Sequence, residues 1–362
     1  MNLDWPLGGL LPAEELWLTQ TDEIDPLLAD PGAPSTPGRS CPLYYRYRPS
    51  EFAVEAAADW RDIEVLYVVG GLYGNELALH EALRLFDAEV GDKRLLFNGD
   101  FHWFDADPAL FARVQYEVLA HHALRGNVET ELAAEPDPET DPGAATGVRS
   151  NGCGCAYPDW VGEGVVERSN RILERLRSAT TQALRAELAA LPMWLRADVG
   201  GARIGIVHGD AESLAGWGFA QEHLLAAAQR ERVRGWFDAA QVDVFASTHT
   251  CLPVFQSFHA EGPAAPRWVC NNGAAGMPNF RGDGAGLLTR IATRPFTGQG
   301  RRFGTRRGEL HLDAIAIDTD ATAVQRCFLA QWPAGSDAHL SYFDRIAHGP
   351  DYRVTQALRT EP

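Results

Sequence analysis

One short apolar run that ends in a carboxylate constrains the fold of this chain more than any other feature. Residues 94–105 read RLLFNGDFHWFD, which places Asp100 just past a run of strand length. A buried parallel strand has this pattern, and it delivers the side chains that follow it to the crevice at the carboxyl end of its sheet. Similar turns end other predicted strands: GGLYGN, GNVE, HGD, THTCLP and NNGAAGMP. We therefore expect these turns to supply partners for Asp100.

The strand and helix signals predict an α/β fold, a two-layer β-sandwich flanked by helices. Residues 65–69 (VLYVV) read as a buried strand, and a glycine turn and a helical repeat of leucines follow it, which starts a βαβ unit. The second half of the chain is mostly predicted strands, and the pair Gly200-Gly201 marks a hairpin. The β pattern continues as far as residues 323–329. Such a series favours two packed sheets with helices outside.

The chain divides into three predicted parts. Residues 1–60 include the stretch LADPGAPSTPGRS and are expected to wrap the core as an irregular extension. Residues 61–335 form one domain, with a helical insertion at about 160–192, where apolar residues follow helical spacing. Residues 336–362 read as a loosely attached C-terminal tail.

Charge and cysteine content limit the partners and the location. The chain has 49 acidic and 32 basic residues, a net charge of −17, which disfavours a nucleic-acid duplex because duplex binding depends on Lys and Arg. The sequence has neither a run of 18 apolar residues nor a secretory start, so we expect no membrane partner. Six scattered cysteines are too few for a disulfide scaffold. We predict a cytoplasmic protein with free thiols.

The order of the turns resembles the calcineurin-like metallophosphoesterase superfamily. Members of that superfamily carry, in sequence, GDxHG, GDxxD, GNH(D/E), a lone His and GHxH, and later an NPGSxGxP turn. The corresponding segments here are GGLYG (70–74), GDFHWFD (99–105), GNVE (126–129), VHGD (207–210), THTCLP (248–253) and NNGAAGMP (271–278). The resemblance spans about residues 63–280 and implies that residues 61–335 are a metallophosphoesterase-like domain.

The resemblance implies one complete metal site. Asp100 matches the bridging carboxylate, Asn127 the asparagine of the GN turn, His208 the lone histidine and His249 the first histidine of GHxH. Mixed His, Asp and Asn ligands suit Mn, Fe or Zn, and the resemblance implies one or two such ions. Divalent ions in these enzymes activate the nucleophile and neutralise the phosphoryl oxygens.

The motif of the other metal site is degenerate. Gly71 and Tyr73 stand where the family has Asp and His, and Cys251 stands where it has the last histidine. Val128 replaces the histidine of GNH, the family's acid or transition-state stabiliser, and valine cannot donate a proton. The chain therefore resembles a divergent member of the superfamily.

Four residues could compensate for these losses. His102 is the candidate proton donor and, with Asp100, the predicted catalytic pair; the alternative is a packed or solvent-facing histidine. Cys251 could be a thiolate ligand that favours zinc, or a small packed residue. Tyr73 could donate its hydroxyl to the substrate, or fill the volume of the lost ligands. Arg281 follows the NNGAAGMP turn and could contact a phosphate.

Two other features have a functional and a plain structural interpretation. Cys153 and Cys155 form a CxC pair that could fold back over the site as a metal clip or redox pair, although we favour an ordinary loop. Six arginines between residues 290 and 307 could clamp a polyphosphate or nucleotide, although we favour a solvated loop that balances an acidic neighbour.

The sequence thus predicts a metal-dependent phosphoesterase with one retained metal site and an altered second site. Its substrate would be a small phosphorylated compound, such as a nucleotide, or a phosphoprotein. The alternative is a catalytically impaired pseudoenzyme that binds phosphate, a nucleotide or a protein partner. A third, weaker interpretation is a thiol-dependent or redox protein built on Cys153, Cys155 and Cys251.

Overall fold

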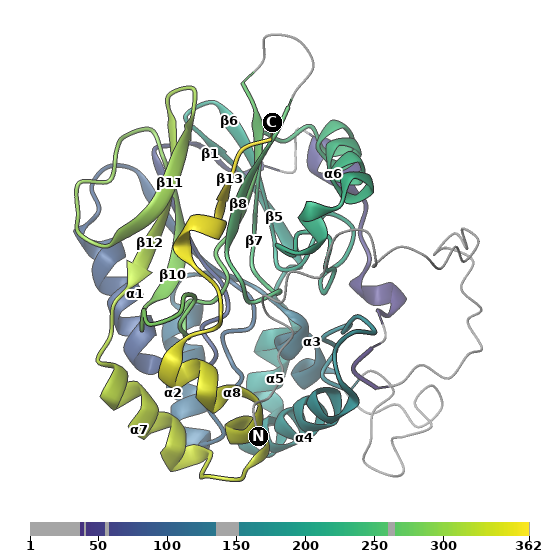
Figure 1. Cartoon of the computed structure of the whole chain (residues 1–362), viewed down its shortest axis with the longest axis vertical. Coiled ribbons are helices and arrows are strands. Elements are labelled where there is room, and N and C mark those ends of the chain that lie inside the picture. The colour runs from purple at the N-terminus through teal and green to yellow at the C-terminus, as the bar shows by residue number, and fades with distance from the viewer. Residues whose placement is uncertain (1–36, 40, 55–57, 135–151, 260–264, 362) are drawn as a thin grey trace.

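The computed structural model describes residues 37–39, 41–54, 58–134, 152–259 and 265–361. Over these residues the chain forms two β-sheets packed face to face, with helices on the outer sides (Figure 1). The seven-stranded sheet has the order β1-β5-β6-β7-β9-β8-β13, and the six-stranded sheet has the order β11-β12-β10-β2-β3-β4. The predicted two-layer β-sandwich flanked by helices is confirmed.

The strands are short, as is usual in globular domains. The seven-stranded sheet consists of β1 (Ala58–Ile63), β5 (Trp194–Val199), β6 (Ala202–Val207), β7 (Val244–Ser247), β9 (Arg267–Asn271), β8 (Val254–Phe258) and β13 (Leu358–Arg359). The six-stranded sheet consists of β11 (Arg301–Arg307), β12 (Leu310–Ile317), β10 (Gly286–Ala292), β2 (Val65–Val69), β3 (Lys93–Asn98) and β4 (His122–Leu124).

Strand β2 is apolar throughout because both of its faces are buried. Leu66 and Val68 point into the layer between the two sheets, where they meet apolar side chains of the opposite sheet. Val65, Tyr67 and Val69 point to the other side, into the cluster that the helices cover. A strand that is buried on both faces reads as a continuous apolar run instead of alternating with polar residues.

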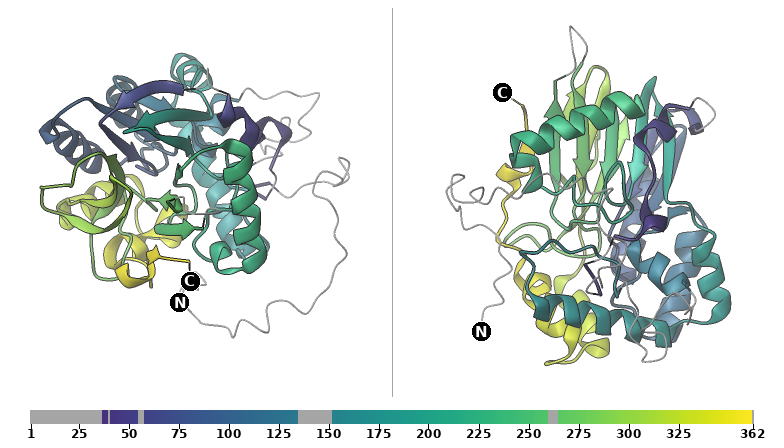
Figure 2. Two further views of the ribbon diagram at one scale, coloured as in Figure 1. Left: turned by 90° about the horizontal axis from the view of Figure 1, so that it is seen from above. Right: turned by 90° about the vertical axis from the view of Figure 1, so that its right-hand side faces the viewer.

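Helices cover both sheets. The six-stranded sheet shares an apolar cluster with α1 (Glu76–Ala88), α2 (Pro108–Leu119), α4 (Glu163–Ala179), α7 (Ala321–Gln331) and α8 (Asp337–His348). Helix α6 (Ala227–Ala240) packs on the seven-stranded sheet, and both views of Figure 2 show it there. The remaining helices are α3 (Asn127–Ala133), α5 (Gln182–Ala189) and the 3₁₀ turns η2 (Leu43–Tyr45), η3 (Pro49–Ala53), η6 (His223–Leu225) and η7 (Val354–Gln356). None of the described helices is both long enough and apolar enough to cross a membrane.

Parallel strands in both sheets position the candidate site. Strands β2, β3 and β4 pair in parallel, and so do β6, β7 and β9. The turns that leave the carboxyl ends of these strands carry Asp100 after β3, His208 after β6 and His249 after β7. These ends meet, so residues far apart in the sequence come together.

Three segments differ from the prediction. Residues 323–329, predicted as a strand, belong to helix α7, which starts because the Asp320 side chain caps its first turn. The helical element at about 160–192 is two helices, and the side chain of Thr181 caps the second of them. The segment predicted as a loose tail forms α8 and β13, and Tyr342 of α8 is buried against the core.

Of the predicted N-terminal extension, residues 1–36 lie outside the described residues. The described part packs on the core: Tyr45 is buried and donates to Glu131 Oε1 at 2.7 Å, and Tyr47 donates to the Asp210 carbonyl at 2.6 Å. Strand β1 then pairs in parallel with β5 at the edge of the seven-stranded sheet.

Candidate metal centre

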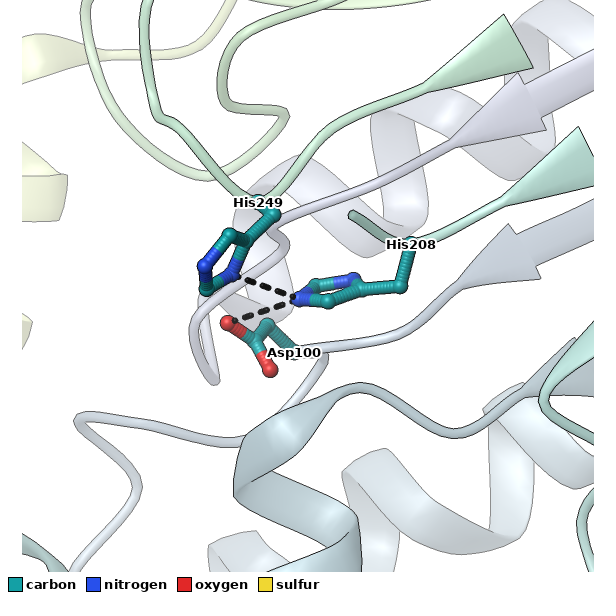
Figure 3. Close-up of side chains that lie close together, drawn as sticks. All are labelled: Asp100, His208 and His249. Carbon is teal, nitrogen blue, oxygen red and sulfur yellow. Dashed lines mark hydrogen bonds and ion pairs between the residues drawn. The ribbon is translucent and has the colours of Figure 1, made fainter. Parts of the chain in front are cut away.

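Three candidate ligands point toward one another at the strand ends. Figure 3 shows the side chains of Asp100, His208 and His249, which come from three different turns. Their ligand atoms all lie within 4.8 Å of one another, and all three side chains are buried. Asn127, the first residue of α3, adds its side-chain oxygen to this group.

The geometry of this group is centred on the Nε2 atom of His208. This atom lies 3.3 Å from Asp100 Oδ2, 3.2 Å from Asn127 Oδ1 and 3.2 Å from His249 Nδ1. Ligand atoms around a tetrahedral zinc ion with bonds of about 2.0–2.1 Å are separated by about 3.3–3.4 Å. The spacing therefore fits a metal ion of this size.

Asp100 and His208 form a buried pair in which each group stabilises the charge of the other. Burial acts to raise the pKa of Asp100, but the charge and hydrogen bond of His208 outweigh it and the pKa is lowered. Burial acts to lower the pKa of His208, but Asp100 outweighs it and the pKa is raised. The Nδ1 atom of His208 donates to the Asn98 carbonyl at 2.8 Å, so Nε2 is the atom that faces the site. An ion bound here would displace the proton on Nε2.

His249 and Asn127 are oriented by the segment that carries the CxC pair. Burial and the nearby charge of His208 lower the pKa of His249 to about 3, so its ring is neutral. Its Nε2 atom donates to the Cys155 carbonyl at 3.2 Å, which leaves the lone pair of Nδ1 facing the site. Asn127 Nδ2 donates to the Cys153 carbonyl at 2.9 Å, which leaves Oδ1 facing the site. The ligand atoms thus present lone pairs to one point, as a cation requires.

Glu129 fixes the turn that carries Asp100, and sequence reasoning missed it. Its Oε2 atom accepts from the backbone N–H groups of Asp100 and Gly126, both at 2.8 Å, and its Oε1 atom accepts from that of His102 at 3.3 Å. The Val128 N–H donates to Asp100 Oδ1 at 3.2 Å. The signal was present in GNVE, because an acid at the third position of a helix can accept the free N–H groups of its first turn.

Backbone strain is concentrated at this site. Seven described non-glycine residues have a positive φ, and four of them lie here: Tyr73 at 56°, Asp100 at 51°, His249 at 43° and Cys251 at 64°. Such conformations cost about 1–3 kcal/mol each and persist where the surroundings enforce them, commonly at functional sites.

A small cavity of about 40 Å³ opens in front of the candidate ligands. This volume holds a few water-sized atoms. Its walls are mainly aromatic, with Trp103, Tyr157, Trp217 and Tyr342 beside Asp100 and the other candidate ligands that line it. Sequence reasoning did not find the last three of these aromatic residues, because they come from segments with no motif of their own.

Comparisons with known proteins agree with this architecture. No family model matches the chain, and a search of curated proteins found no match. A hypothetical protein from Pyrococcus horikoshii OT3 is similar in structure, with a TM-score of 0.52 and 15% identity over 80% of this chain and 99% of that one. A metallophosphoesterase from Sphaerobacter thermophilus has a TM-score of 0.46 and 14% identity over 79% and 99%. At these identities the likeness concerns the fold alone.

Tyr73 and Cys251, two residues of the predicted altered second site, contact each other beside the cavity. The Tyr73 hydroxyl lies 2.9 Å from Cys251 Sγ, and the Tyr73 ring covers Gly71 so closely that a Cβ there would meet ring atoms at 2.9 Å. Burial raises the pKa of both groups, that of Tyr73 well above its usual value. Both side chains line the cavity as neutral groups, and Cys251 lies beside the converging ligand atoms without being one of them.

The structure does not bring His102 and Arg281 into the cavity. His102 is fully buried, its Nδ1 atom lies 2.5 Å from Asp105 Oδ2, and its ring stacks on Phe111 with the centroids 3.6 Å apart. Arg281 has 66% of its side chain exposed and pairs with Asp351 at 2.8 Å. Neither residue lines the cavity. These positions contradict the predictions of His102 as a proton donor and of Arg281 as a phosphate contact.

The CxC segment does fold back over the site. Cys155 lines the cavity, and both Cys153 and Cys155 are buried free thiols. Burial raises the pKa of Cys155 well above its usual value, so the thiol is neutral. The backbone carbonyls of the pair, not their sulfur atoms, contact the candidate ligands through the bonds described above.

The arginine-rich segment is balanced by carboxylates, as predicted, but it is not a solvated loop: Arg290 lies in β10 with 1% of its side chain exposed, and Arg301–Arg307 form strand β11. All six arginines form ion pairs: Arg290 with Glu89 and Asp313, Arg294 with Glu64, Arg301 with Asp313, Arg302 with Asp283 and Asp318, Arg306 with Glu309, and Arg307 with Asp243. The guanidinium groups are therefore occupied and none lines the cavity.

Proposed function

We propose that this protein is a metal-dependent phosphoesterase with one retained metal site and an altered second site. The observation that carries the proposal is the convergence of three acceptor atoms, from Asp100, Asn127 and His249, at 3.2–3.3 Å from His208 Nε2, whose proton a metal ion would replace. The order of the turns, which resembles that of the calcineurin-like metallophosphoesterases, supports phosphate-ester hydrolysis as the reaction class.

The residues of the site have separate roles in this proposal. Asp100, Asn127, His208 and His249 would hold a divalent ion, and their nitrogen and oxygen atoms suit Mn, Fe or Zn. When bound, such an ion polarises a phosphoryl oxygen and lowers the pKa of a bound water. Tyr73 keeps its proton because burial raises its pKa, so its hydroxyl can donate a hydrogen bond to a substrate oxygen after leaving Cys251.

The substrate would be a small phosphorylated compound or a phosphoprotein, because the cavity of about 40 Å³ has room for little more than a phosphoryl group. Trp103, Trp217 and Tyr342 would surround the phosphoryl group, where exclusion of water strengthens its attraction to the bound charge.

An activity assay tests this proposal. We expect the purified protein, supplied with Mn²⁺, Fe²⁺ or Zn²⁺, to hydrolyse an aryl phosphate, and Asp100→Ala to reduce the rate to background because it removes the charged ligand. His348→Ala is a suitable control because His348 is an exposed histidine on α8. Activity that survives Asp100→Ala would contradict the proposal.

A catalytically impaired pseudoenzyme is the second candidate function. It is favoured by Val128, which lines the cavity where the resemblance puts a histidine, and by the burial of His102 away from the cavity. In that case the protein would bind a metal ion and inorganic phosphate, nucleotide or a protein partner without turnover. Phosphate binding by the metal-loaded protein, measured by calorimetry alongside the assay, separates the two functions.

A further inference from the structure

The CxC segment, residues 152–155, contacts two candidate metal ligands through its backbone. The Cys153 carbonyl accepts from Asn127 Nδ2 at 2.9 Å, and the Cys155 carbonyl accepts from His249 Nε2 at 3.2 Å. These two ligands come from different turns, one after β4 and one after β7. One short segment thus holds ligands from both sheets.

These bonds decide which atoms of the two ligands face the site. A carbonyl oxygen only accepts, so His249 carries its proton on Nε2 and turns the lone pair of Nδ1 toward His208 Nε2, 3.2 Å away. The amide of Asn127 has two chemically different ends, and its bond to the segment turns Oδ1 toward the same atom, also at 3.2 Å. Without these bonds, either side chain could present a donor where a metal ion needs an acceptor.

We propose that the CxC segment sets the metal affinity of this site by holding Asn127 and His249 in the orientation that binds an ion. The inference rests on the metal site of the proposed function. It assigns the segment a role that depends on its backbone carbonyls and not on thiol chemistry.

Two remote side chains fix the position of the segment. Asn170 Oδ1 accepts from the Cys153 N–H at 2.9 Å, and Asn170 Nδ2 donates to the Pro37 carbonyl at 3.2 Å. Trp217 Nε1 donates to the Cys155 carbonyl at 3.0 Å, the same oxygen that His249 uses. Asn170 and Trp217 are therefore positioning residues.

The path of the segment also explains its glycines. Gly152 and Gly154 have φ values of 53° and 65°, which side chains rarely adopt. A Cβ on Gly154 would lie 2.0 Å from Tyr45 Oη. The segment is therefore closely packed and well suited to orient other groups.

Metal titration of positioning variants tests the inference. Trp217→Phe keeps a ring beside His249 but removes the N–H donor, and Asn170→Ala removes the bond to Cys153. We expect each variant to bind Zn²⁺ or Mn²⁺ about 10–100-fold more weakly in calorimetric titrations, the usual effect of losing a partner of a metal ligand. The matched control is Trp160→Phe, since the Trp160 ring lies 5.7 Å from that of Trp217. We expect the control to bind like the wild type.

A measurement on the ion-free protein distinguishes positioning from a general loss of structure. Nitrogen-15 NMR of the imidazole rings should show the His249 proton on Nε2 in the wild type and shared between Nδ1 and Nε2 in Trp217→Phe. If the wild type binds the ion and the variants bind it equally tightly, the inference is overturned and the proposed function remains intact. A wild type that binds no ion would overturn both.

Discussion

Replacing His208 by alanine should lower the affinity for Zn²⁺ or Mn²⁺ at least about 100-fold, more than the loss of any single partner of a ligand. The reason is its central place: its Nε2 atom lies within 3.3 Å of the facing atoms of Asp100, Asn127 and His249. Calorimetric titration of the ion-free protein measures this change.

Two further variants test whether the loss of affinity is specific to the imidazole of His208. His348→Ala removes an exposed histidine, 74% of whose side chain is accessible, and should leave the affinity unchanged. His208→Gln keeps a polar side chain of similar size but moves the acceptor atom, so this variant should also bind the ion weakly. If His208→Ala binds the ion as tightly as the wild type, then His208 is not a ligand.

Replacing Arg290 by methionine should destabilise the protein by about 3–5 kcal/mol, because it removes the nearest cation of the buried Glu89 and one of the two cations of the buried Asp313. Arg290 and Asp313 each have 1% of their side chain exposed, and Glu89 has 8%. Arg290 lies 2.6 Å from Glu89 and 3.4 Å from Asp313. Urea unfolding at pH 7 measures the change. The control Arg306→Met removes an exposed pair with Glu309 and should cost about 1 kcal/mol or less.

The effect of Arg290→Met should shrink in acid. Burial acts to raise the pKa of Glu89, but the hydrogen bond and charge of Arg290 outweigh it, so the pKa is lowered in the folded protein. A lowered pKa stabilises the fold above the unfolded value, about 4.3, and this contribution is lost as the pH falls through the lower folded value. Without Arg290, burial is opposed by the weaker effects of the hydrogen bonds from Tyr67 and the Val90 N–H, so the pKa of Glu89 rises and it takes up a proton at higher pH. The two unfolding free energies should therefore converge below about pH 4, and a constant difference would contradict the role of Glu89.

The sequence predicted the sheets and the candidate ligands for a physical reason. VLYVV is apolar throughout because β2 is buried on both faces, and parallel strands deliver the next residues to one edge. The convergence of Asp100, His208 and His249 follows from this rule and from the order of the turns. Sequence reasoning succeeded where a local pattern determines a position.

The remaining features depend on contacts that no local pattern records. His102 is two residues after Asp100, but the left-handed backbone at Asp100 redirects the chain and His102 packs on Phe111. Helix α8 was predicted as a loose tail because its partner α4 lies far away in the sequence. Residues 323–329 were predicted as a strand because a short apolar run is compatible with both a strand and a helix. In the structure the Asp320 side chain caps the first turn of a helix that includes this run.

The packing at the predicted altered second site could not be derived from the sequence. The sequence shows only that Gly71, Tyr73 and Cys251 replace the family's ligands. The packing shows that the Tyr73 ring covers Gly71 and that its hydroxyl contacts Cys251 at 2.9 Å. We propose that these contacts fill the place that a second ion would take, so we expect one ion per chain.

Anomalous X-ray scattering from crystals of the protein grown with Zn²⁺ or Mn²⁺ tests the central claim most directly. We expect one strong peak per chain at this site, within bonding distance of Asp100, Asn127, His208 and His249, with the Tyr73 to Cys251 contact still in place. Two peaks at this site would show that the second metal position is functional. A crystal with no peak between these four residues would contradict the metal centre itself.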